Sequence, residues 1–282
     1  MNPVTAAPDS GRIAPMSGPA TIGESCVDRY LPPIGLDTPG GNALNVAAGL
    51  AAAGLPTAHV GAVGEDDEGR FVLARAAERA IDTRHVAVLP GRTGLTTITV
   101  GPDGDRVFES EELGVSSTFR PSDEAVEFLK ARSWVHATGP ADIVDALGAV
   151  AAAGVPISYD VYHPPRTERL HELAPLLTVA FLSAPDGSAA DAADLARDAV
   201  SRGAGAAVVS RGKDGCLMLE NGRLHDQPAT PARVVDTLGA GDAMIAGVIG
   251  ALLRGSTPDS ALRQAASAAA AACTHVGAWG PD

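Results

Sequence analysis

A short run of small and acidic residues near the carboxyl end of the sequence is the part best suited to chemistry. It reads Asp236-Thr237-Leu238-Gly239-Ala240-Gly241-Asp242 and leads into an apolar stretch with the pattern of a helix over 242–253. The small residues leave the backbone N–H groups of 239–241 open to an anion, and the helix dipole adds about half a positive charge there. The Asp242 carboxylate could accept a proton from an attacking hydroxyl group. The combination suits phosphoryl transfer, in which positioning and electrostatics outweigh the base itself.

Helix capping is the alternative role of the same carboxylate. An Asp side chain at a helix N-terminus contributes about 1 kcal/mol by accepting a backbone hydrogen bond. Asp236 and Thr237, immediately upstream, form a polar and tightly turned approach that a cap does not require. We therefore favour the catalytic interpretation of Asp242.

A second glycine-containing segment lies near the amino end and suits the binding of a polyol. It reads Thr38-Pro39-Gly40-Gly41-Asn42-Ala43-Leu44-Asn45 and begins a predicted helix over 42–53. The two glycines let the backbone approach a ligand closely, and the two amides can donate and accept hydrogen bonds. Simple capping by Asn42 is the alternative. Asp28, just after the first predicted strand, would add a carboxylate for sugar hydroxyls.

Composition narrows the classes of partner and compartment. The 282 residues carry 21 basic and 34 acidic side chains, a net charge of −13, which disfavours nucleic acid and anionic membranes as partners. Cys26, Cys216 and Cys273 lack C-x-x-C spacing, so we expect a reducing, cytoplasmic location, with the last two as small core residues. No apolar run reaches the ~18–20 residues of a membrane span, and we recognise no signal peptide. Residues 1–18 are interpreted as a flexible N-terminal extension.

The elements that must position these residues alternate along the chain. Short apolar runs separated by helical stretches predict βαβ units and a mostly parallel sheet. The predicted strands are 20–22, 59–63, 134–138, 157–160, 179–182 and 206–210, and the predicted helices are 42–53, 68–79, 141–153, 190–201, 242–253 and 260–274. Two segments break the alternation: the extended piece 30–38 and a β-hairpin over 96–108 with Pro102-Asp103-Gly104 at its turn. They could form a small sheet that closes over the substrate and excludes water.

The two glycine-containing motifs together resemble those of the PfkB (ribokinase-like) carbohydrate kinases. Gly40-Gly41-Asn42, followed by Val60-Gly61-Ala62-Val63-Gly64-Glu65-Asp66-Asp67-Glu68-Gly69, resembles the family's amino-terminal pattern, and 236–242 resembles its carboxy-terminal pattern. The resemblance covers roughly residues 20–280. It implies a ribokinase-like three-layer α/β/α core with a mostly parallel central sheet and a small β-sheet lid. The kinase domain would span 19–282, with the lid formed by about 29–39 and 92–118.

Within that family, the chain most resembles the fructoselysine 6-kinase branch. The residues that carry this finer resemblance are Asp105-Arg106-Val107-Phe108, Gly114-Val115, Ser183-Ala184-Pro185 and His275-Val276-Gly277-Ala278-Trp279. It implies ATP-dependent phosphorylation of a primary hydroxyl, namely the 6-hydroxyl of fructoselysine or a related fructosamine. The alternatives are a kinase of the same family for another ketose, a deoxy-keto sugar or a nucleoside, and a non-catalytic sugar sensor of the same fold.

The resemblance also implies roles for individual residues. Asp242 would be the catalytic base, with Gly239, Ala240 and Gly241 as the anion hole. Sugar would be bound by Asp28, Gly40, Gly41, Asn42 and Asn45. ATP would lie against Ser210, Gly212, Lys213, Gly215, Thr237, Gly239 and Gly241, with the adenine beside Ala266 and Ala270. Mg²⁺ would be held chiefly by phosphates and waters. A monovalent cation such as K⁺ near the Asp236 segment, and a homodimer formed through the lid, are features of relatives that the sequence leaves open.

Several residues depart from the family pattern or have two interpretations. Where the family commonly has N-x-x-E for magnesium, this chain has Ser183-Ala184-Pro185-Asp186, in which Asp186 keeps a shorter carboxylate. Glu24 stands where many relatives have Asp. The acidic residues of the predicted lid are either solvated or attract a cationic substrate tail; they are Glu109, Glu111 and Glu112.

Further candidates for substrate contact come from the hairpin and from the ends of strands. Arg106 on the hairpin would face the substrate or form a salt bridge at the lid edge. His136 and Asp160 lie near the ends of predicted strands, with Tyr162 and His163 just beyond. Ligands of open α/β folds bind at the carboxyl edge of the sheet, so we expect these side chains at the site.

Overall fold

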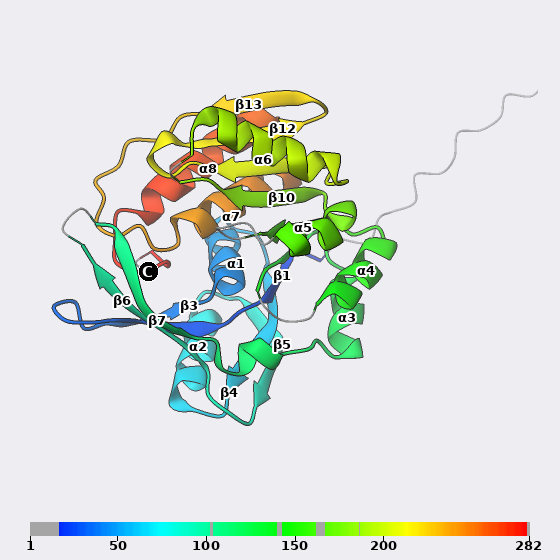
Figure 1. Cartoon of the computed structure of the whole chain (residues 1–282). Coiled ribbons are helices and arrows are strands. Elements are labelled where there is room, and N and C mark those ends of the chain that lie inside the picture. Colours follow the sequence, from blue (N-terminus) through cyan, green and yellow to red (C-terminus); the bar gives the residue numbers. More distant parts are fainter. Residues whose placement is uncertain (1–16, 102–103, 140–142, 162–166, 186, 281–282) are drawn as a thin grey trace, which may run out of the picture.

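The computed structural model describes residues 17–101, 104–139, 143–161, 167–185 and 187–280. Predictions that concern Pro102, Asp103, Tyr162, His163 and Asp186, and the extension up to residue 16, lie outside the described residues. Within the described part, the strands form a nine-stranded sheet and a separate four-stranded sheet. Helices cover both faces of the larger sheet (Figure 1).

The large sheet is mostly parallel, and the order in which the chain adds strands to it reverses at β1, the first strand. Its order is β13-β12-β11-β10-β9-β8-β1-β4-β5, so the chain builds outward from β1 (Ala20–Gly23) first to one side and then to the other. Its other parallel strands are β4 (Ala58–Gly64), β5 (Asp82–Leu89), β8 (Val135–Ala137), β9 (Ile157–Asp160), β10 (Val179–Ser183) and β11 (Ala206–Ser210). An antiparallel hairpin of β12 (Cys216–Glu220) and β13 (Arg223–Gln227) completes one edge. Open sheets bind ligands beyond the carboxyl ends of strands at such a reversal.

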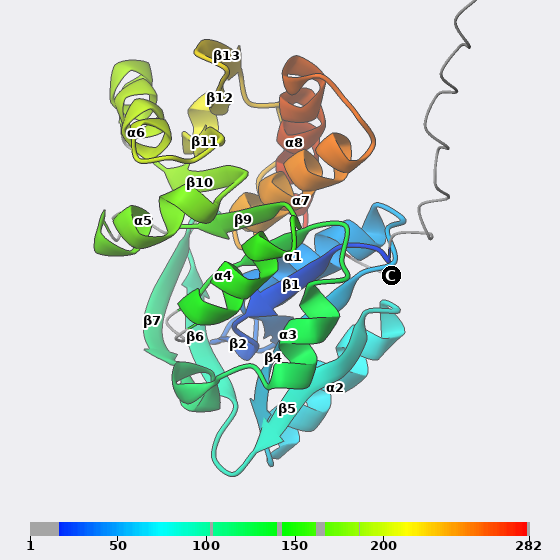
Figure 2. The same ribbon diagram turned by 90° about the vertical axis from the view of Figure 1, so that its right-hand side faces the viewer.

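Helices pack on the two faces because side chains alternate along each strand. Phe181 of β10 belongs to the cluster formed with α1, α7 and α8, whereas its neighbour Leu182 belongs to the cluster on the opposite face. One face carries α1 (Asn42–Ala52), α2 (Asp67–Glu78), α7 (Ala240–Leu253) and α8 (Pro258–Ala272). The other carries α3 (Asp123–Leu129), α4 (Val144–Ala152), α5 (Thr167–Leu173) and α6 (Ala189–Ser201). Figure 2 shows the sheet between these layers. The predicted three-layer α/β/α core with a mostly parallel sheet is confirmed.

The smaller sheet has the order β3-β2-β6-β7 and is called the small sheet below. It consists of β2 (Cys26–Tyr30), β3 (Asp37–Gly40), β6 (Gly94–Val100) and β7 (Arg106–Glu112). Strands β2 and β6 are parallel, and the pairs β2–β3 and β6–β7 are antiparallel. It lies beside the start of α1 (Figure 1). The predicted extended piece 30–38 therefore corresponds mostly to the connection between β2, which ends at Tyr30, and β3, which begins at Asp37.

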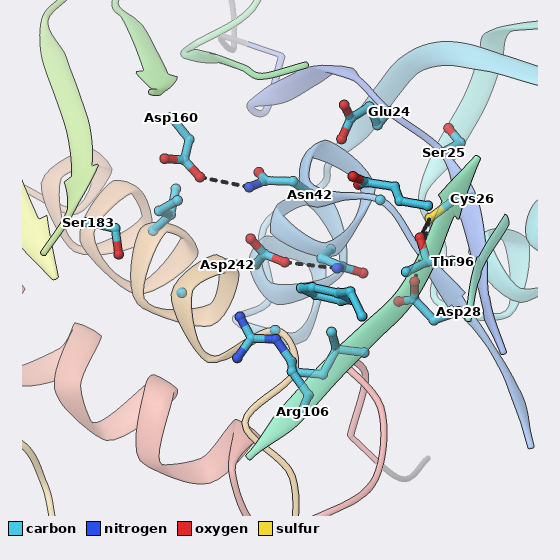
Figure 3. A pocket seen from close by; sticks show the side chains of 18 of the residues that line it. Glu24, Ser25, Cys26, Asp28, Asn42, Thr96, Arg106, Asp160, Ser183 and Asp242 are labelled. Atoms are coloured by element: carbon cyan, nitrogen blue, oxygen red, sulfur yellow. Dashed lines mark hydrogen bonds between the residues drawn. The ribbon is translucent and has the colours of Figure 1, made fainter. Parts of the chain in front are cut away.

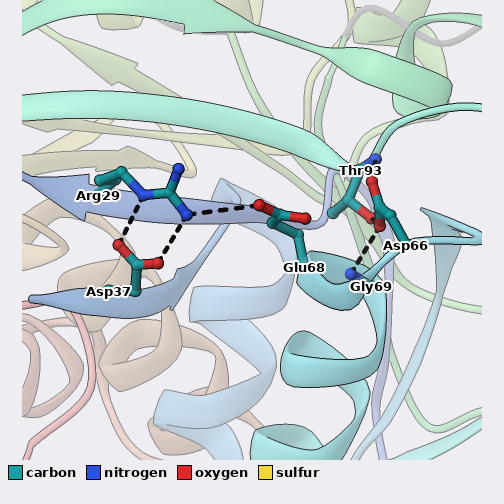
Figure 4. Close-up of polar contacts among 6 residues, drawn as sticks. All are labelled: Arg29, Asp37, Asp66, Glu68, Gly69 and Thr93. Carbon is teal, nitrogen blue, oxygen red and sulfur yellow. Dashed lines mark hydrogen bonds and ion pairs between the residues drawn. The ribbon is translucent and has the colours of Figure 1, made fainter.

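Ionic and polar contacts fix the small sheet to the core (Figure 4). The Arg29 guanidinium on β2 forms an ion pair with Asp37 on β3 at 2.8 Å, and it reaches Glu68 on α2 at 3.4 Å. Asp66 caps α2 by accepting a hydrogen bond from the Gly69 N–H at 2.9 Å, and it also accepts one from the Thr93 N–H at 2.8 Å. Because Thr93 immediately precedes β6, this carboxylate holds one end of the small sheet to the core.

Short elements complete the described chain. The 3₁₀ helices are η1 (Gly114–Thr118), η2 (Ala174–Leu176) and η3 (Gly212–Asp214). Helix α7 begins at Ala240, two residues before the predicted start, and α4 is described from Val144 onward rather than from 141. Strands β5, β12 and β13 and helices α3 and α5 were not predicted. No helix among the described residues is both long and apolar enough to cross a bilayer.

Candidate active site

A pocket of about 600 Å³ opens at the carboxyl ends of the strands, between the large sheet and the small sheet. Asp160, Ser183 and Ser210, at the ends of β9, β10 and β11, line it from one side. The first turns of α1 and α7 and the strands β2, β6 and β7 supply other parts of its wall. Figure 3 shows the side chains of Asp242, Asn42, Asp160 and Arg106 around the same space. The two glycine-containing motifs, almost 200 residues apart, thus meet at one pocket.

Helix α7 begins at the pocket, where the Ala240 N–H donates to the Thr237 backbone oxygen at 3.3 Å. Gly239 is its N-cap residue, with φ of 75°, and no side chain caps the helix. Asp242 is the third residue of α7, and its carboxylate accepts a hydrogen bond from Asn45 Nδ2 at 2.8 Å. Burial raises the pKa of Asp242 to about 7, and the Asn45 hydrogen bond opposes this rise. The capping alternative for Asp242 is wrong, because its side chain faces Asn45 and the pocket.

Helix α1 begins in the same manner on the opposite side. Gly41 is the N-cap residue with φ of 98°, and a Cβ there would lie 2.5 Å from the Glu24 backbone oxygen, so only glycine fits. The Asn42 side chain does not cap the helix: its Nδ2 donates to Asp160 at 2.7 Å. Among the described residues, buried Asn42 Oδ1 has no hydrogen-bond partner. A buried acceptor without a partner is costly, so this atom is suited to a ligand hydroxyl.

Asp28 lies on β2 with its buried carboxylate at the pocket wall. Burial raises the pKa of Asp28 to about 7, and a 3.6 Å hydrogen bond from the Cys26 thiol opposes the rise. Gly40 on β3 does not line the pocket but lies directly behind this carboxylate, since a Cβ at residue 40 would lie 2.2 Å from Asp28 Oδ2. Gly40 therefore acts by leaving room for Asp28.

Arg106 joins the small sheet to the start of α7. One of its guanidinium nitrogens donates to Thr237 Oγ1 at 3.0 Å, and the guanidinium lies 5.3 Å from the centre of the Phe108 ring. Its buried Nε has no partner among the described residues. Arg106 lines the pocket, as the first of its two interpretations predicts. The contacts of its guanidinium among the described residues are with Thr237 and Phe108, so the salt bridge at the lid edge stays a prediction.

The described pocket lining is strongly acidic. It contains one cationic side chain, Arg106, and six carboxylates: Glu24, Asp28, Glu111, Glu112, Asp160 and Asp242. Glu109 of the predicted acidic patch is not part of this lining, and its carboxylate accepts a hydrogen bond from Thr99 on the exposed side. A neutral sugar alone does not require so many negative charges at its binding site.

The structure does not bring every predicted residue to this lining. His136 is fully buried in β8, where its Nδ1 lies 3.0 Å from Ser158 Oγ and its ring meets the edge of Phe181. Burial lowers the pKa of His136 to about 3. The prediction that it contacts substrate is therefore wrong, because its side chain points into a layer of the core. Outside the described lining lie Ala240, Thr237, Gly212, Lys213, Gly215, Ala266 and Ala270.

Two buried contacts at the site were not predicted. Asp236 is fully buried; its carboxylate accepts hydrogen bonds from the Tyr30 hydroxyl, from the Gly277 N–H at 2.9 Å and from the Leu238 N–H at 2.9 Å. Trp279 Nε1 donates to Asn45 Oδ1 at 2.9 Å. The only signals in the sequence were the acidic residue at 236 and the tryptophan near the end, and neither identifies its partner.

Cation binding can be compared with the donor groups that are present. The described residues contain no cluster of three or more His, Cys, Asp or Glu side chains arranged to hold a metal. The pocket carboxylates still suit Mg²⁺ that arrives with a nucleotide, since this ion keeps phosphate and water ligands and uses one or two carboxylates. Asp236 accepts three hydrogen bonds across its two oxygens, and a monovalent cation near this segment stays a prediction.

The mostly parallel sheet between two layers of helices, together with the small sheet, defines the class of fold as ribokinase-like. A solved structure of ribokinase from Arabidopsis thaliana, complexed with ribose and ATP, superposes with a TM-score of 0.81 at 23% identity, over 93% of this chain and 94% of that one. A model of the pfkB family of carbohydrate kinases matches residues 36–281. The chain belongs to this family, as the sequence motifs predicted, and it is a carbohydrate kinase.

Curated relatives agree with the finer resemblance. A fructosamine kinase from Bacillus subtilis is 31% identical over 264 residues, which cover 92% of each chain. A fructoselysine 6-kinase from Escherichia coli is 33% identical over 260 residues, covering 92% of this chain and 98% of that one. Membership of a kinase family implies ATP as the phosphoryl donor and a sugar as the acceptor.

Proposed function

We propose that this kinase transfers the γ-phosphoryl group of ATP to the 6-hydroxyl of a fructosamine, with fructoselysine as the first candidate. The observation that carries the proposal is the placement of Asp242 and the start of α7, which no side chain caps, at a pocket whose described lining holds six carboxylates and one cationic side chain. The fructosamine and fructoselysine kinases among the relatives support the same substrate class.

The sugar is held on the side of α1 and β2. Asn42 Oδ1, which has no partner among the described residues, accepts a hydrogen bond from a sugar hydroxyl, while Asp28 and Asn45 contact others. Gly41 allows the backbone to approach the ring without a side chain in between. These contacts place the primary hydroxyl near Asp242, which accepts its proton as the new P–O bond forms.

The phosphates lie at the start of α7. The N–H groups of Gly239 and Gly241, two residues that line the pocket, stabilise the charge on the transferred group. The Ala240 N–H, by contrast, donates to the Thr237 backbone oxygen at 3.3 Å. The rest of ATP extends past Ser210 toward the turn that contains Gly212, Lys213 and Gly215. Mg²⁺, when bound with the nucleotide, neutralises phosphate charge, and Asp160 or Asp186 could provide a carboxylate ligand.

The acidic lining selects the tail of the substrate. Fructoselysine carries an amine-linked lysine whose ammonium groups are attracted to Glu111 and Glu112 of β7, which line the pocket. Free fructose and ribose lack such cations and gain nothing from these carboxylates. Partly exposed charge pairs of this type contribute about 0.2–1 kcal/mol each, so the preference is built from several of them.

The test is a coupled assay of ADP release with fructoselysine, fructose, ribose and adenosine. We expect the highest kcat/KM with fructoselysine. Glu111→Gln together with Glu112→Gln should raise KM for fructoselysine by about three- to tenfold and leave KM for fructose unchanged. Glu109→Gln, on the same strand but outside the described lining, is the matched control and should change neither value. Activity on ribose or adenosine with none on fructosamines would refute the proposed substrate.

Two alternatives predict different results in the same assay. A kinase for another ketose, a deoxy-keto sugar or a nucleoside would release ADP with that substrate and ignore the double Gln variant. A non-catalytic sugar sensor would bind sugar without releasing ADP, and Asp242→Asn would leave its binding unchanged.

A homodimer formed through the small sheet stays a prediction. Edge strand β7 exposes Val107 and Phe108, each with 53% of its surface accessible, which is unusual for large apolar side chains. Light scattering of the wild type and of Val107→Glu measures the oligomeric state directly. A wild-type dimer that the variant converts to a monomer is the expected result.

A further inference from the structure

The carboxyl-terminal segment 276–280 packs directly against residues 236–242, which lead into α7 and are called the catalytic turn below. A Cβ at Gly239 would lie 2.5 Å from Ala278 Cβ and 2.7 Å from Ala278 Cα, so the two segments are in close contact. The Gly277 N–H donates to Asp236 at 2.9 Å, and the Arg79 guanidinium donates to the Gly280 backbone oxygen. The segment is thus fastened on both sides of Trp279.

Trp279 is connected to the carboxylate of Asp242 by two hydrogen bonds through the side chain of Asn45. Its indole Nε1 donates to Asn45 Oδ1 at 2.9 Å, and Asn45 Nδ2 donates to Asp242 Oδ2 at 2.8 Å. An indole N–H can only donate, so it must face the amide oxygen of Asn45. The amide nitrogen then faces Asp242. The two partners fix the orientation of the amide by their chemistry, which removes the usual ambiguity between its oxygen and nitrogen.

A reversed Asn45 amide would harm the site. Its oxygen would then face the carboxylate of Asp242, two acceptors would oppose each other, and the hydrogen bond that opposes the rise in the pKa of Asp242 would be lost. The Trp279 N–H prevents this reversal, because it would find no acceptor if the nitrogen of the amide faced it.

We propose that Trp279 is a positioning residue for phosphoryl transfer, which acts through Asn45 to keep a hydrogen-bond donor on the carboxylate of Asp242. The inference rests on the proposed role of Asp242 as the proton acceptor. It gives the carboxyl-terminal segment a part in catalysis. The sequence does not indicate this part, because Trp279 and Asn45 are 234 positions apart.

A double-mutant cycle with Trp279→Phe, Asn45→Ala and the combined variant tests this. Trp279→Phe keeps an aromatic ring and removes the donor, and it should lower kcat by about three- to tenfold, as expected for one lost hydrogen bond, without changing KM for ATP. The acid limb of its kcat–pH profile should move to higher pH. In the Asn45→Ala background, the same change should alter kcat by less than about twofold, because the amide that connects Trp279 to Asp242 is already absent.

The control is the other tryptophan of the chain. Trp134 Nε1 donates to Ser158 Oγ at 2.9 Å within the core, so Trp134→Phe also removes one indole hydrogen bond and should leave kcat and the pH profile unchanged. Should Trp279→Phe not fold, Trp279→His keeps a ring N–H and should retain kcat within about threefold.

Each outcome separates the inference from the function on which it rests. An unchanged kcat and pH profile in Trp279→Phe, or equal losses in both backgrounds, would overturn the role of Trp279 while an active wild type and an inactive Asp242→Asn support the proposed function. A loss of kcat greater than about threefold in Trp279→His would also overturn the role of Trp279. A wild type that phosphorylates no sugar would overturn both.

Discussion

Two glycines in the catalytic turn, only two residues apart, should respond to the same substitution in opposite ways. Gly239 has φ of 75°, and a Cβ there would lie 2.5 Å from Ala278. Gly241 lies within α7, and a Cβ there would have no neighbour within 4 Å. Replacing each with alanine therefore separates the stability of the turn from its chemistry.

The expected magnitudes follow from these geometries. For Gly239→Ala, the left-handed backbone alone costs about 1–2 kcal/mol, and displacement of Ala278 adds to it. A total of about 2 kcal/mol lowers Tm by about 4–8 °C in a chain of this size. Gly241→Ala should keep or slightly raise Tm, since alanine favours a helix by about 1 kcal/mol over glycine. Its methyl group, however, enters the pocket in front of the amides, and kcat should fall by about 10²-fold.

Thermal unfolding and the coupled ADP assay measure the two effects on the same preparations. The reasoning is refuted if Gly241→Ala retains the wild-type kcat, because the phosphoryl group would then pass elsewhere. A Gly239→Ala variant with the wild-type Tm would contradict the close contact with Ala278.

Further predictions concern the buried carboxylates. Because Asp242 must be charged to accept a proton and its pKa is raised to about 7, kcat should fall about tenfold per pH unit below 7; a flat profile between pH 5 and 8 would contradict this. The raised pKa also means that the folded state binds protons that the unfolded state releases between pH 4 and 7, so this carboxylate costs stability above pH 7, and Asp242→Asn should raise Tm at pH 8 more than at pH 5. Gly40→Ala places a methyl group 2.2 Å from the Asp28 carboxylate and should raise KM for the sugar, by about tenfold or more, whereas Gly148→Ala, with no neighbour within 4 Å, should leave it unchanged.

The alternation of apolar runs and helices was enough to predict the core, but not its edges. Strand β5 is a half-exposed edge strand with Asp82, Arg84 and His85, so it lacks the continuous apolar run of an interior strand. The β12–β13 hairpin did carry a signal: Asn221 and Gly222, with φ of 50° and 74°, form the kind of turn that joins two strands.

For the site, too, only some residues could be predicted from the sequence. Local motifs indicated Asp242, Asn42 and their glycines, because a helix N-terminus is defined by neighbours in the sequence. Contacts between distant residues could not be predicted in this way: Trp279 and Asn45 are separated by 234 positions, and Tyr30 and Asp236 by 206. Only the folded chain shows which donors reach which acceptors.

The prediction for His136 failed for a related reason. A position near the end of a parallel strand indicates the correct edge of the sheet, but alternate side chains point to opposite faces. His136 points toward Ser158 and Phe181 within the core, whereas Asp160, at the last position of β9, reaches the pocket. The final residue of a strand is therefore a better indicator of a ligand contact than the residue before it.

The central claim is that Asp242 accepts the proton of the attacking hydroxyl beside the amides of α7. The most direct measurement is kcat for ADP release by wild type and Asp242→Asn with saturating fructoselysine and ATP. The Asn side chain keeps the size of the group and removes its basicity, so kcat should fall by about 10²- to 10⁴-fold with KM for ATP little changed. A variant that retains kcat within about tenfold of the wild type would contradict the account.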